Sequence, residues 1–361
     1  MTQTYLLPPS PIERIDDFLS AGGGRGLERA LQIGKTATID LVTAAGLRGR
    51  GGAGFSVGRK WASVRDGGAG TRFVVANGAE GEPATFKDRM LPGLLPPYEL
   101  GLFATDLAIG WESGNRPVSG RAEANPTVVN NVETLASAAH ILANGVEWFR
   151  AMGTHDSPGT IIATVVGDVV RPGVHEVEMG TPFSELLAMC GGPLPGRRYK
   201  AAFSGVSNAV LPADAFETPL TYEHFAARGS GLGAAGFVVY DDSVNMTLIA
   251  YELSRFLAAE SCGQCPPCKQ GSLAITADLA SICDGGATDA VLGQLATRLR
   301  AVTDANRCFL GSEEQVVVSS ILREFPDDVA ALLEGRSTSA RAVRVPPIDH
   351  IADDGTVTHH A

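Results

Sequence analysis

The residues best suited to chemistry are cysteines grouped in one part of the chain. Three of them share a short loop, and a fourth follows after a stretch with helical periodicity: Cys262, Cys265, Cys268 and Cys308. A compact loop of this kind can ligate three irons of a cubane, and a remote fourth cysteine can complete the ligand set. Gly263 and the pair Pro266-Pro267 turn and stiffen the loop, so the thiolates can converge with little further loss of backbone freedom. The spacing therefore predicts a [4Fe–4S] cluster.

A structural zinc site and a redox disulfide are the competing interpretations of these cysteines. Structural zinc usually takes two Cys-x-x-Cys pairs or adds histidines, and no histidine lies between His224 and the tail. A redox disulfide would use two of the cysteines and leave the others without a role. The remaining two, Cys190 and Cys283, lie in apolar helical contexts and are interpreted as buried small hydrophobic residues.

A second group of residues suited to ligand binding is the glycine-rich run from Arg48 to Gly54. Glycines let backbone N–H groups approach a phosphate closely, and Arg48 and Arg50 could supply positive charge. Phe55 could stack on a flavin or nicotinamide ring, and Lys60 could neutralise a phosphate or a reduced flavin. The alternative is a flexible glycine turn with solvated arginines.

The same run matches the Gly-x-Gly-x-x-Gly fingerprint of dinucleotide-binding domains at Gly49, Gly51 and Gly54. That fingerprint requires a strand before the glycines and a helix after them. Here the apolar residues between Ile39 and Leu47 predict a helix before the run. The sequence therefore does not predict a Rossmann domain.

Composition sets the class of protein. The length of 361 residues fits two or three domains, and 44% hydrophobic residues suffice for real cores. No apolar run is long enough to span a membrane. A net charge of −11 argues against nucleic-acid binding, which needs a basic surface. A cytoplasmic protein is expected, either free or held on the cytoplasmic face of the membrane by partner subunits.

Residues 1–158 are predicted to form an α/β domain behind an N-terminal arm. The arm is polar and carries a short helix near Leu27–Ile33. A short apolar run at Arg72–Ala76 predicts a buried strand, and the apolar spacing of Thr127–Ala143 predicts a helix. The strand delivers the loop that begins at Asn77 to one edge of the domain.

Two further domains and a tail are predicted. Residues 159–243 alternate strands with a helix that starts at Thr181-Pro182, as a small ubiquitin-like (β-grasp) domain would. The strands are expected at Thr160–Val166, Val174–Glu178, Lys200–Ser204 and Gly236–Tyr240. Residues 244–335 show helical periodicity and predict a bundle that carries the cysteines, with helices at Val244–Glu260, Leu273–Cys283, Ala290–Thr303, Glu313–Phe325 and Asp328–Leu333. Residues 336–361 are polar and are predicted to be disordered. The expected fold class is a multidomain protein with α/β and α+β parts.

Four motifs occur in the same order as in one known family. They are Gly49-Arg-Gly-Gly-Ala-Gly-Phe55, Ala76-Asn-Gly-Ala-Glu-Gly-Glu-Pro83, Val129-Asn-Asn-Val-Glu-Thr-Leu135, and Glu260-Ser-Cys-Gly-Gln-Cys265 with Cys308. The chain resembles the NADH-binding flavoprotein subunit (51 kDa-type) of respiratory complex I and the related modules of NAD-linked hydrogenases and formate dehydrogenases. The resemblance extends from about residue 20 to residue 335.

The resemblance implies a role for each matching residue. FMN contacts fall on Gly49, Gly51, Lys60, Asn77, Glu80, Asn130, Asn131 and Thr134, with Gly52 and Gly54 in the same glycine loop. NADH contacts fall on Phe55, Lys60 and Glu82. The cluster ligands are Cys262, Cys265, Cys268 and Cys308. No residue is implied as a catalytic acid or base.

The implied function is NADH:acceptor oxidoreduction of the quinone type, in which a hydride passes from NADH to FMN and single electrons pass to the [4Fe–4S] cluster. A flavin can take up two electrons at once and release them singly, which this pairing requires. The implied partners are the other subunits of an NADH-oxidising complex, including a [2Fe–2S] thioredoxin-like subunit.

Two departures from the family pattern concern the flavin domain. Ala79 stands where the family has an aspartate, which removes one acceptor for a flavin hydroxyl. Between Arg89 and Leu94 the chain also omits a long α/β stretch that in the family includes a Gly-Glu-Glu loop over the flavin. A sheet without those strands exposes an edge. The expected product is a truncated FMN/NADH domain with weak or absent FMN. The alternative is a non-enzymatic iron–sulfur electron relay or assembly protein.

Overall fold

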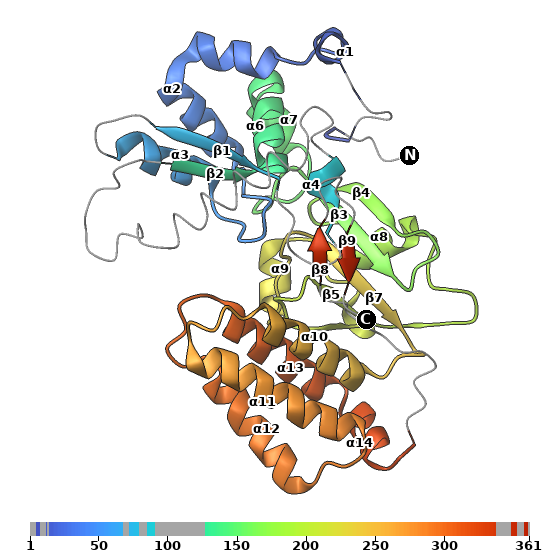
Figure 1. The fold of residues 1–361 in the computed structure, drawn as a ribbon. Helices are drawn as coiled ribbons and strands as arrows, with labels where there is room; N and C mark the ends of the chain where they lie inside the picture. Colours follow the sequence, from blue (N-terminus) through green and yellow to red (C-terminus); the bar gives the residue numbers. More distant parts are fainter. Residues whose placement is uncertain are drawn as a thin grey trace. The chain divides into compact units, whose positions relative to one another are not determined.

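Figure 1 shows the computed structural model, whose described residues are 5–7, 12, 14–67, 72–78, 85–90, 127–336, 348–351 and 357–359. The chain forms two compact units. The first unit holds residues 1–192 and 216–237, and the second holds residues 193–215 and 238–361. Both units contain helices and strands, so the predicted mixed class of fold is confirmed.

Two helices, α1 (Ile15–Ser20) and α2 (Arg25–Ala45), open the first unit. Gly34 interrupts α2 with a φ of 78°, a left-handed value that glycine adopts without a Cβ clash. The prediction of helical stretches on both sides of this position is confirmed, and one kinked helix joins them. α2 packs against α6 (Val132–Asn144).

A two-stranded parallel sheet is formed by β1 (Phe73–Asn77) and β2 (Thr127–Asn131). The helix predicted at Thr127–Ala143 was placed too early. Its first five residues form β2, and α6 starts only at Val132. β-branched residues dominate this segment and favour a strand. The side chain of Asn131 then caps α6 by accepting a hydrogen bond from the amide of Glu133.

Three further helices complete this part of the first unit: α3 (Val57–Asp66), the short α4 (Lys87–Met90) and α7 (Val146–Arg150). α3 contacts both α2 and β2. Helices α2, α3, α6 and α7 share a core of side chains that are almost fully buried, namely Val42, Ala45, Leu47, Val57, Ile141 and Phe149. This core fixes the ends of the glycine run, because α2 and α3 both contribute to it.

The larger sheet has the strand order β4-β3-β7-β5-β6. β3 (Thr160–Gly167) pairs antiparallel with β4 (Gly173–Glu178), and β5 (Tyr199–Ser204) pairs antiparallel with β6 (Leu211–Pro212). β7 is Gly236–Asp241. β3 is buried along nearly its whole length, as an interior strand should be. The four strands predicted from the sequence in this region are confirmed.

Two helices and a 3₁₀ turn accompany this sheet. α8 (Phe183–Met189) follows Pro182, as predicted, and the 3₁₀ turn is Ala213–Ala215. α9 (Tyr222–Ala227) was not predicted. Its start is capped by Thr221, whose hydroxyl accepts a hydrogen bond from an amide in the first turn.

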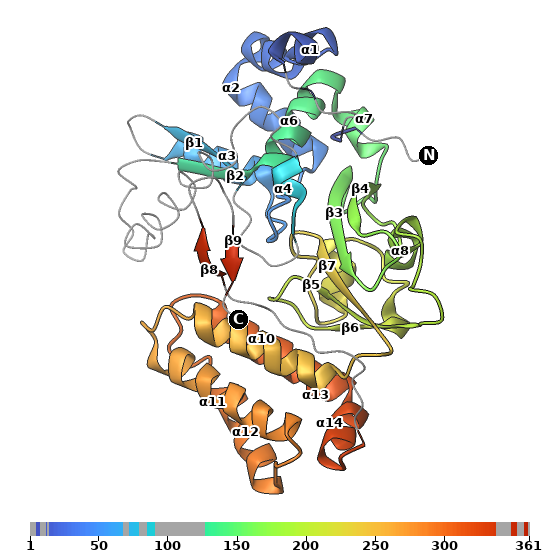
Figure 2. The ribbon, with the colours of Figure 1, turned by 45° about the vertical axis from the view of Figure 1, so that its right-hand side comes forward.

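Five helices form most of the second unit: α10 (Met246–Glu260), α11 (Pro266–Cys283), α12 (Asp289–Ala301), α13 (Leu310–Glu324) and α14 (Pro326–Leu333). Figure 2 shows them packed against one another. They share a buried core that includes Ile249, Leu253, Ile275, Leu279, Leu295, Val317 and Ile321. α11 starts seven residues earlier than predicted, because the two prolines at its first positions fit a helix start.

The last described segments are β8 (Ile348–Ile351) and β9 (Val357–His359), which pair antiparallel. The sequence predicted disorder throughout this tail, so the prediction is wrong for these two strands. The rest of the tail beyond residue 336 lies outside the described residues. Across the described segments, no helix has the combination of length and apolarity needed to cross a membrane.

Candidate functional site

The glycine run forms a tight loop between two helices. α2 ends at Ala45 and α3 begins at Val57, and within the described segment 14–67 no strand precedes the glycines. The departure from a Rossmann arrangement is therefore confirmed. The amide of Gly49 donates a hydrogen bond to the carbonyl of Phe55 at 2.8 Å, and this bond closes the loop.

The amide groups at the tip of this loop are the clearest candidates for ligand binding. Within the part of the chain that the structure describes, the N–H groups of Gly51, Gly52, Ala53 and Gly54 donate no hydrogen bond. Gly52 and Gly54 have φ values of 120° and 58°, in the range that favours glycine. Successive free amides in such a turn form a concave site for an anion. This tip can hold a phosphate.

Arg50 does not take part in that site. Its side chain is fully buried, and its guanidinium donates to the carbonyls of Pro158 at 3.0 Å and Thr160 at 3.1 Å. Its backbone amide donates to the hydroxyl of Thr134 at 2.9 Å. The expectation that Arg50 supplies charge to a ligand is therefore wrong, and both Arg50 and Thr134 hold the loop in place instead.

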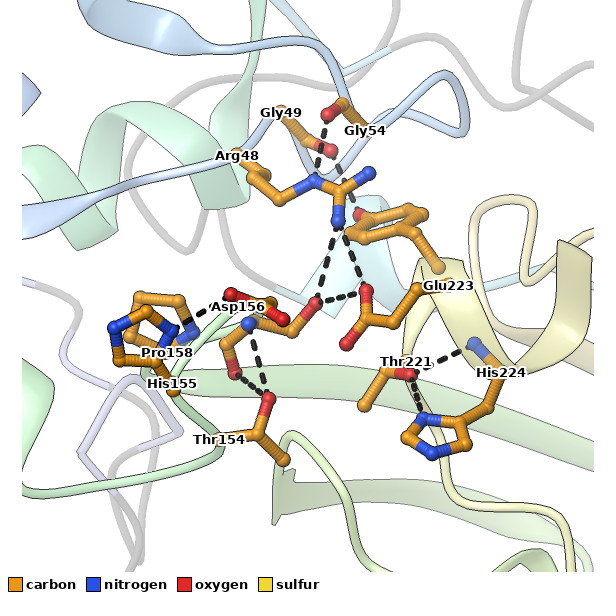
Figure 3. Close-up of polar contacts among 12 residues, drawn as sticks. Arg48, Gly49, Gly54, Thr154, His155, Asp156, Pro158, Thr221, Glu223 and His224 are labelled. Atoms are coloured by element: carbon orange, nitrogen blue, oxygen red, sulfur yellow. Dashed lines mark hydrogen bonds and ion pairs between the residues drawn. The ribbon is translucent and has the colours of Figure 1, made fainter.

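Arg48 lies at the rim of the loop and also has protein partners. Its guanidinium makes an ion pair with Glu223 at 3.0 Å, and its Nε donates to the carbonyl of Gly54 at 2.9 Å (Figure 3). It also lies 4.3 Å from the ring centroid of Tyr222. The positive charge of Arg48, which was predicted to attract an anion, is thus balanced by the carboxylate of Glu223. The sequence did not indicate that these two residues are neighbours.

Three predicted asparagines lie at the carboxyl ends of the parallel strands. Asn77 is in register with Asn131, and Asn130 precedes it on β2. Asn130 is buried and its Oδ1 accepts from Trp61 Nε1 at 2.9 Å. A Cβ built on Gly51 would lie 3.2 Å from the Cβ of Asn131, so the loop tip and the strand ends adjoin. Ligands of parallel sheets usually bind at this edge.

A buried ion pair beneath the loop was not predicted. Lys87 and Glu133 are both fully buried, and the ammonium of Lys87 bonds to the carboxylate of Glu133. Lys87 also donates to the carbonyl of Arg50 at 2.7 Å, and Glu133 accepts from the amide of Ile162 at 2.8 Å. Glu133 stands in one of the four sequence motifs, but a charged residue in a loop or a helix is usually solvated, so the pair was not expected. The pair joins the glycine loop, α6 and β3.

The remaining predicted nucleotide contacts have different surroundings. Phe55 is 53% exposed, with the guanidinium of Arg59 5.8 Å from its ring centroid, so one face of the ring is free to stack. Lys60 donates to the carbonyl of Val129, and burial lowers the pKa of its ammonium. Glu80 and Glu82 lie outside the described residues.

The strand predicted near Arg72–Ala76 is confirmed as β1, but the prediction that it is buried is wrong for its first two residues. Val74 on β1 is 70% exposed and Phe73 is 46% exposed. Parallel strands are normally covered on both faces. The exposure fits the expectation that a stretch of the flavin domain is missing.

The four predicted cluster ligands lie at adjoining ends of the helices in the second unit. Cys268 is in the first turn of α11 and is 6% exposed, whereas Cys265 is half-buried and Cys262 and Cys308 are exposed. In the sequence, α10 ends two residues before Cys262, α11 begins directly after Cys265, and α13 begins two residues after Cys308.

A hydrogen bond joins the two cysteine segments. Arg307 donates to the side-chain oxygen of Gln264 at 3.1 Å, so the turn before Cys308 contacts the loop that holds Cys262 and Cys265. Among the residues that the structure describes, no three His, Cys, Asp or Glu side chains lie close enough together to hold a metal ion. The segments therefore meet, while the sulfurs are not at ligand distances from one site.

Comparison with known proteins places both regions in one family. Residues 42–93 match the Nuo51 FMN-binding domain, residues 162–203 match the SLBB domain, and residues 248–332 match the NADH-ubiquinone oxidoreductase-F iron-sulfur binding region. An NADH-quinone oxidoreductase subunit of Rhizobium meliloti is 31% identical over 89% of this chain and 95% of that protein. The chain belongs to the 51 kDa-type flavoprotein family.

Other members of the 51 kDa-type family are similarly close. The alpha subunit of the NAD-reducing hydrogenase HoxS of Cupriavidus necator is 29% identical over 83% of this chain and 61% of that protein. A crystal structure of an NAD+-reducing [NiFe]-hydrogenase in the air-oxidised state matches with a TM-score of 0.74 and 30% identity, covering 89% of this chain and 67% of that chain.

The same comparisons support the predicted deletion. The match to the FMN-binding domain ends at residue 93, where the sequence was expected to jump. The alignment with the Rhizobium meliloti protein runs over 400 positions, which exceeds the 361 residues of this chain. That 51 kDa-type relative therefore carries residues inside the matched region that this chain lacks.

Proposed function

We propose that this chain is the NADH-oxidising flavoprotein subunit of a multi-subunit enzyme. One observation carries the proposal: a region that matches an FMN-binding domain and a region that matches an iron–sulfur domain occur in order on the same chain. When bound, FMN accepts a hydride from NADH, and the [4Fe–4S] cluster takes electrons onward singly. No proton-transferring side chain is required.

The proposed FMN site combines the glycine loop with the strand ends. The free amides of Gly51, Gly52 and Gly54 are suited to a phosphate, because successive amides in such a turn form a concave anion site. Glycine is needed at these positions because a Cβ would obstruct or strain the loop. The remaining proposed contacts are Gly49, Lys60, Asn77, Glu80, Asn130 and Asn131. Thr134, which the resemblance also implied, is fully buried and acts indirectly, because its hydroxyl accepts a hydrogen bond from the amide of Arg50.

The proposed NADH site lies over the flavin and uses Phe55, Lys60 and Glu82. Phe55 is open to solvent and offers a flat apolar surface to a ring. Partial burial lowers the pKa of Lys60, and in this partly dry setting the charge of its ammonium acts more strongly on a nearby anion.

The proposed cluster ligands are Cys262, Cys265, Cys268 and Cys308. Four thiols on adjoining helix ends are the donor set that a cubane takes. The hydrogen bond between Gln264 and Arg307 supports the convergence of the two segments.

The proposed domain arrangement follows these roles. Residues 1–158 form the arm and a truncated FMN/NADH domain, residues 159–243 a β-grasp domain and residues 244–335 a helical bundle with the cluster, followed by a tail at 336–361. The β-grasp proposal is supported by the SLBB match. The proposed partners include a [2Fe–2S] thioredoxin-like subunit, and any membrane contact is through such partners.

Metal and flavin analysis tests the function. Anaerobically purified chain is expected to contain four irons and to show thiolate-to-iron absorbance. FMN added to it should confer NADH-dependent reduction of an artificial dye. Zinc with little iron contradicts the cluster, and a chain that never binds FMN contradicts the flavin chemistry.

A non-enzymatic electron relay or assembly protein is the second candidate. The end of the FMN-domain match at residue 93 and the exposure of Phe73 and Val74 on β1 favour it, because a flavin pocket without the missing stretch would lack one wall. An iron-loaded chain that binds no FMN but exchanges electrons with a small redox dye would support this candidate.

A further inference from the structure

The start of α9 braces the glycine loop. The hydroxyl of Tyr222 donates to the carbonyl of Gly49 at 2.8 Å. The ring of Tyr222 also fills the space beside Gly54, where a Cβ would lie 2.7 Å from a ring carbon. One side chain, distant in sequence, thus contacts both ends of the loop.

Arg48 and Glu223 form the second contact between α9 and the loop. Arg48 Nε donates to the carbonyl of Gly54, and its terminal nitrogen pairs with Glu223 (Figure 3). Glu223 also accepts from the hydroxyl of Ser157 at 2.8 Å. The side chains of Arg48 and Glu223 are 29% and 34% exposed, so the pair lies at the surface of the loop.

These contacts have two consequences for the loop. The carbonyls of Gly49 and Gly54 are both bonded, so the backbone between them is held with its amides free. The guanidinium of Arg48 is neutralised at the rim by Glu223. The shape of the anion site and its charge are therefore controlled by neighbouring residues of one helix.

We propose that Tyr222 and Glu223 are positioning residues that set the affinity of the glycine loop for an anionic group. Tyr222 fixes the loop in its open-amide conformation, and Glu223 limits the positive charge of Arg48. Only the identity of the anion, the phosphate of FMN, rests on the proposed function.

The charge of Glu223 is secure at neutral pH. Partial burial raises the pKa of its carboxyl, but hydrogen bonds from its own amide and from the hydroxyls of Ser157 and Thr221, together with the charge of Arg48, outweigh this and lower it. Glu223 is thus an anion wherever NADH chemistry takes place, and it competes with a phosphate for Arg48.

Two substitutions are expected to act in opposite directions. Tyr222→Phe removes one hydrogen bond from the loop and should weaken FMN binding roughly fivefold. Glu223→Gln keeps the shape but frees the charge of Arg48, so FMN should bind roughly threefold more tightly, with a steeper dependence on salt. Glu185→Gln, which changes an exposed acid in the first turn of α8, is the matched control and should leave FMN affinity unchanged.

The full iron-loaded chain is used for these titrations, with FMN fluorescence as the readout. Hydrogen exchange of residues 49–55 is measured in the same variants without FMN. Tyr222→Phe should speed exchange of the loop amides and leave iron content unchanged. Shifts of FMN affinity in the same direction for both variants, or unchanged exchange in Tyr222→Phe, overturn the proposal. If the unsubstituted chain binds no FMN, the proposed function fails, and the exchange measurement alone decides the role of Tyr222.

Discussion

The two cofactor regions differ in how completely the chain encloses them. The cysteine helices α10 to α13 share one buried core, and their match to the iron-sulfur domain covers residues 248–332. Among the residues that the structure describes, the flavin region has a glycine loop with free amides and two parallel strands, one of which exposes Val74. An iron–sulfur cluster needs only the few short segments that supply its ligands, whereas a flavin needs a pocket that encloses most of its surface. The loss of one stretch therefore affects the two regions unequally.

Cys308→Ser should have the largest effect, because it removes a proposed ligand from the region whose helices share one buried core. The expected result is loss of most of the iron together with a lower melting temperature, since metal binding is coupled to folding. Iron content and thermal unfolding under anaerobic conditions give the answer. Cys283→Ser, which changes a half-buried cysteine outside the ligand set, should keep its iron. Equal iron loss in both variants would count against the ligand assignment.

Lys87→Met should damage the flavin region and spare the cluster region. It leaves the carboxylate of Glu133 buried without its partner, which costs about 3–5 kcal/mol. Urea unfolding monitored by Trp61 fluorescence measures the loss, and iron content serves as the reference for the other region. Adding Glu133→Leu should recover part of the stability, because no unpaired charge then remains. A double variant no more stable than the single one would contradict the buried pair.

Glu314→Gln should stabilise the cluster region in a pH-dependent way. Burial raises the pKa of Glu314 from 4.5 to about 8, so the folded chain binds a proton that the unfolded chain has lost in this range. The free energy of unfolding of the unsubstituted chain therefore falls as pH rises from about 4.5 to about 8. The variant lacks this loss and should gain roughly 2–4 kcal/mol over the unsubstituted chain by pH 8. Urea unfolding at pH 5 and pH 8 measures it, and an equal gain at both pH values would refute the burial argument.

Flavin retention should differ from iron retention by a smaller margin. The chain is expected to bind FMN about tenfold more weakly than an undeleted relative, about 1.4 kcal/mol, because the ring has less apolar wall to cover it. Gel filtration in buffer without FMN should remove flavin while iron stays bound. Flavin that remains stoichiometric through this step would show that the two regions are equally complete.

Local sequence signals predicted most of the elements. Runs such as Thr160–Gly167 and Met246–Glu260 have one clear periodicity, and the structure has a strand and a helix there. The errors fall where two signals meet. β2 runs directly into α6, so a single apolar pattern covered both, and Pro266 was interpreted as part of a loop although proline also suits a first helical turn.

The candidate site was harder to predict because its contacts are distant in sequence. The cysteine spacing is local and indicated its chemistry directly. By contrast, nothing near Arg50 indicates that carbonyls at Pro158 and Thr160 will bury it, and nothing near Arg48 indicates Glu223. The sign of a charge can be read from sequence, but its partner depends on the tertiary fold.

The hydrogen bond between Gln264 and Arg307 has a consequence for how iron enters the chain. It holds the turn before Cys308 against the loop that carries Cys262 and Cys265. Capture of a partly ligated cluster by Cys308, the proposed fourth ligand, would then be an intramolecular step with a high effective concentration, of the order of millimolar for a short tether. Cluster insertion would be limited by delivery of iron and sulfide rather than by the search of the last ligand.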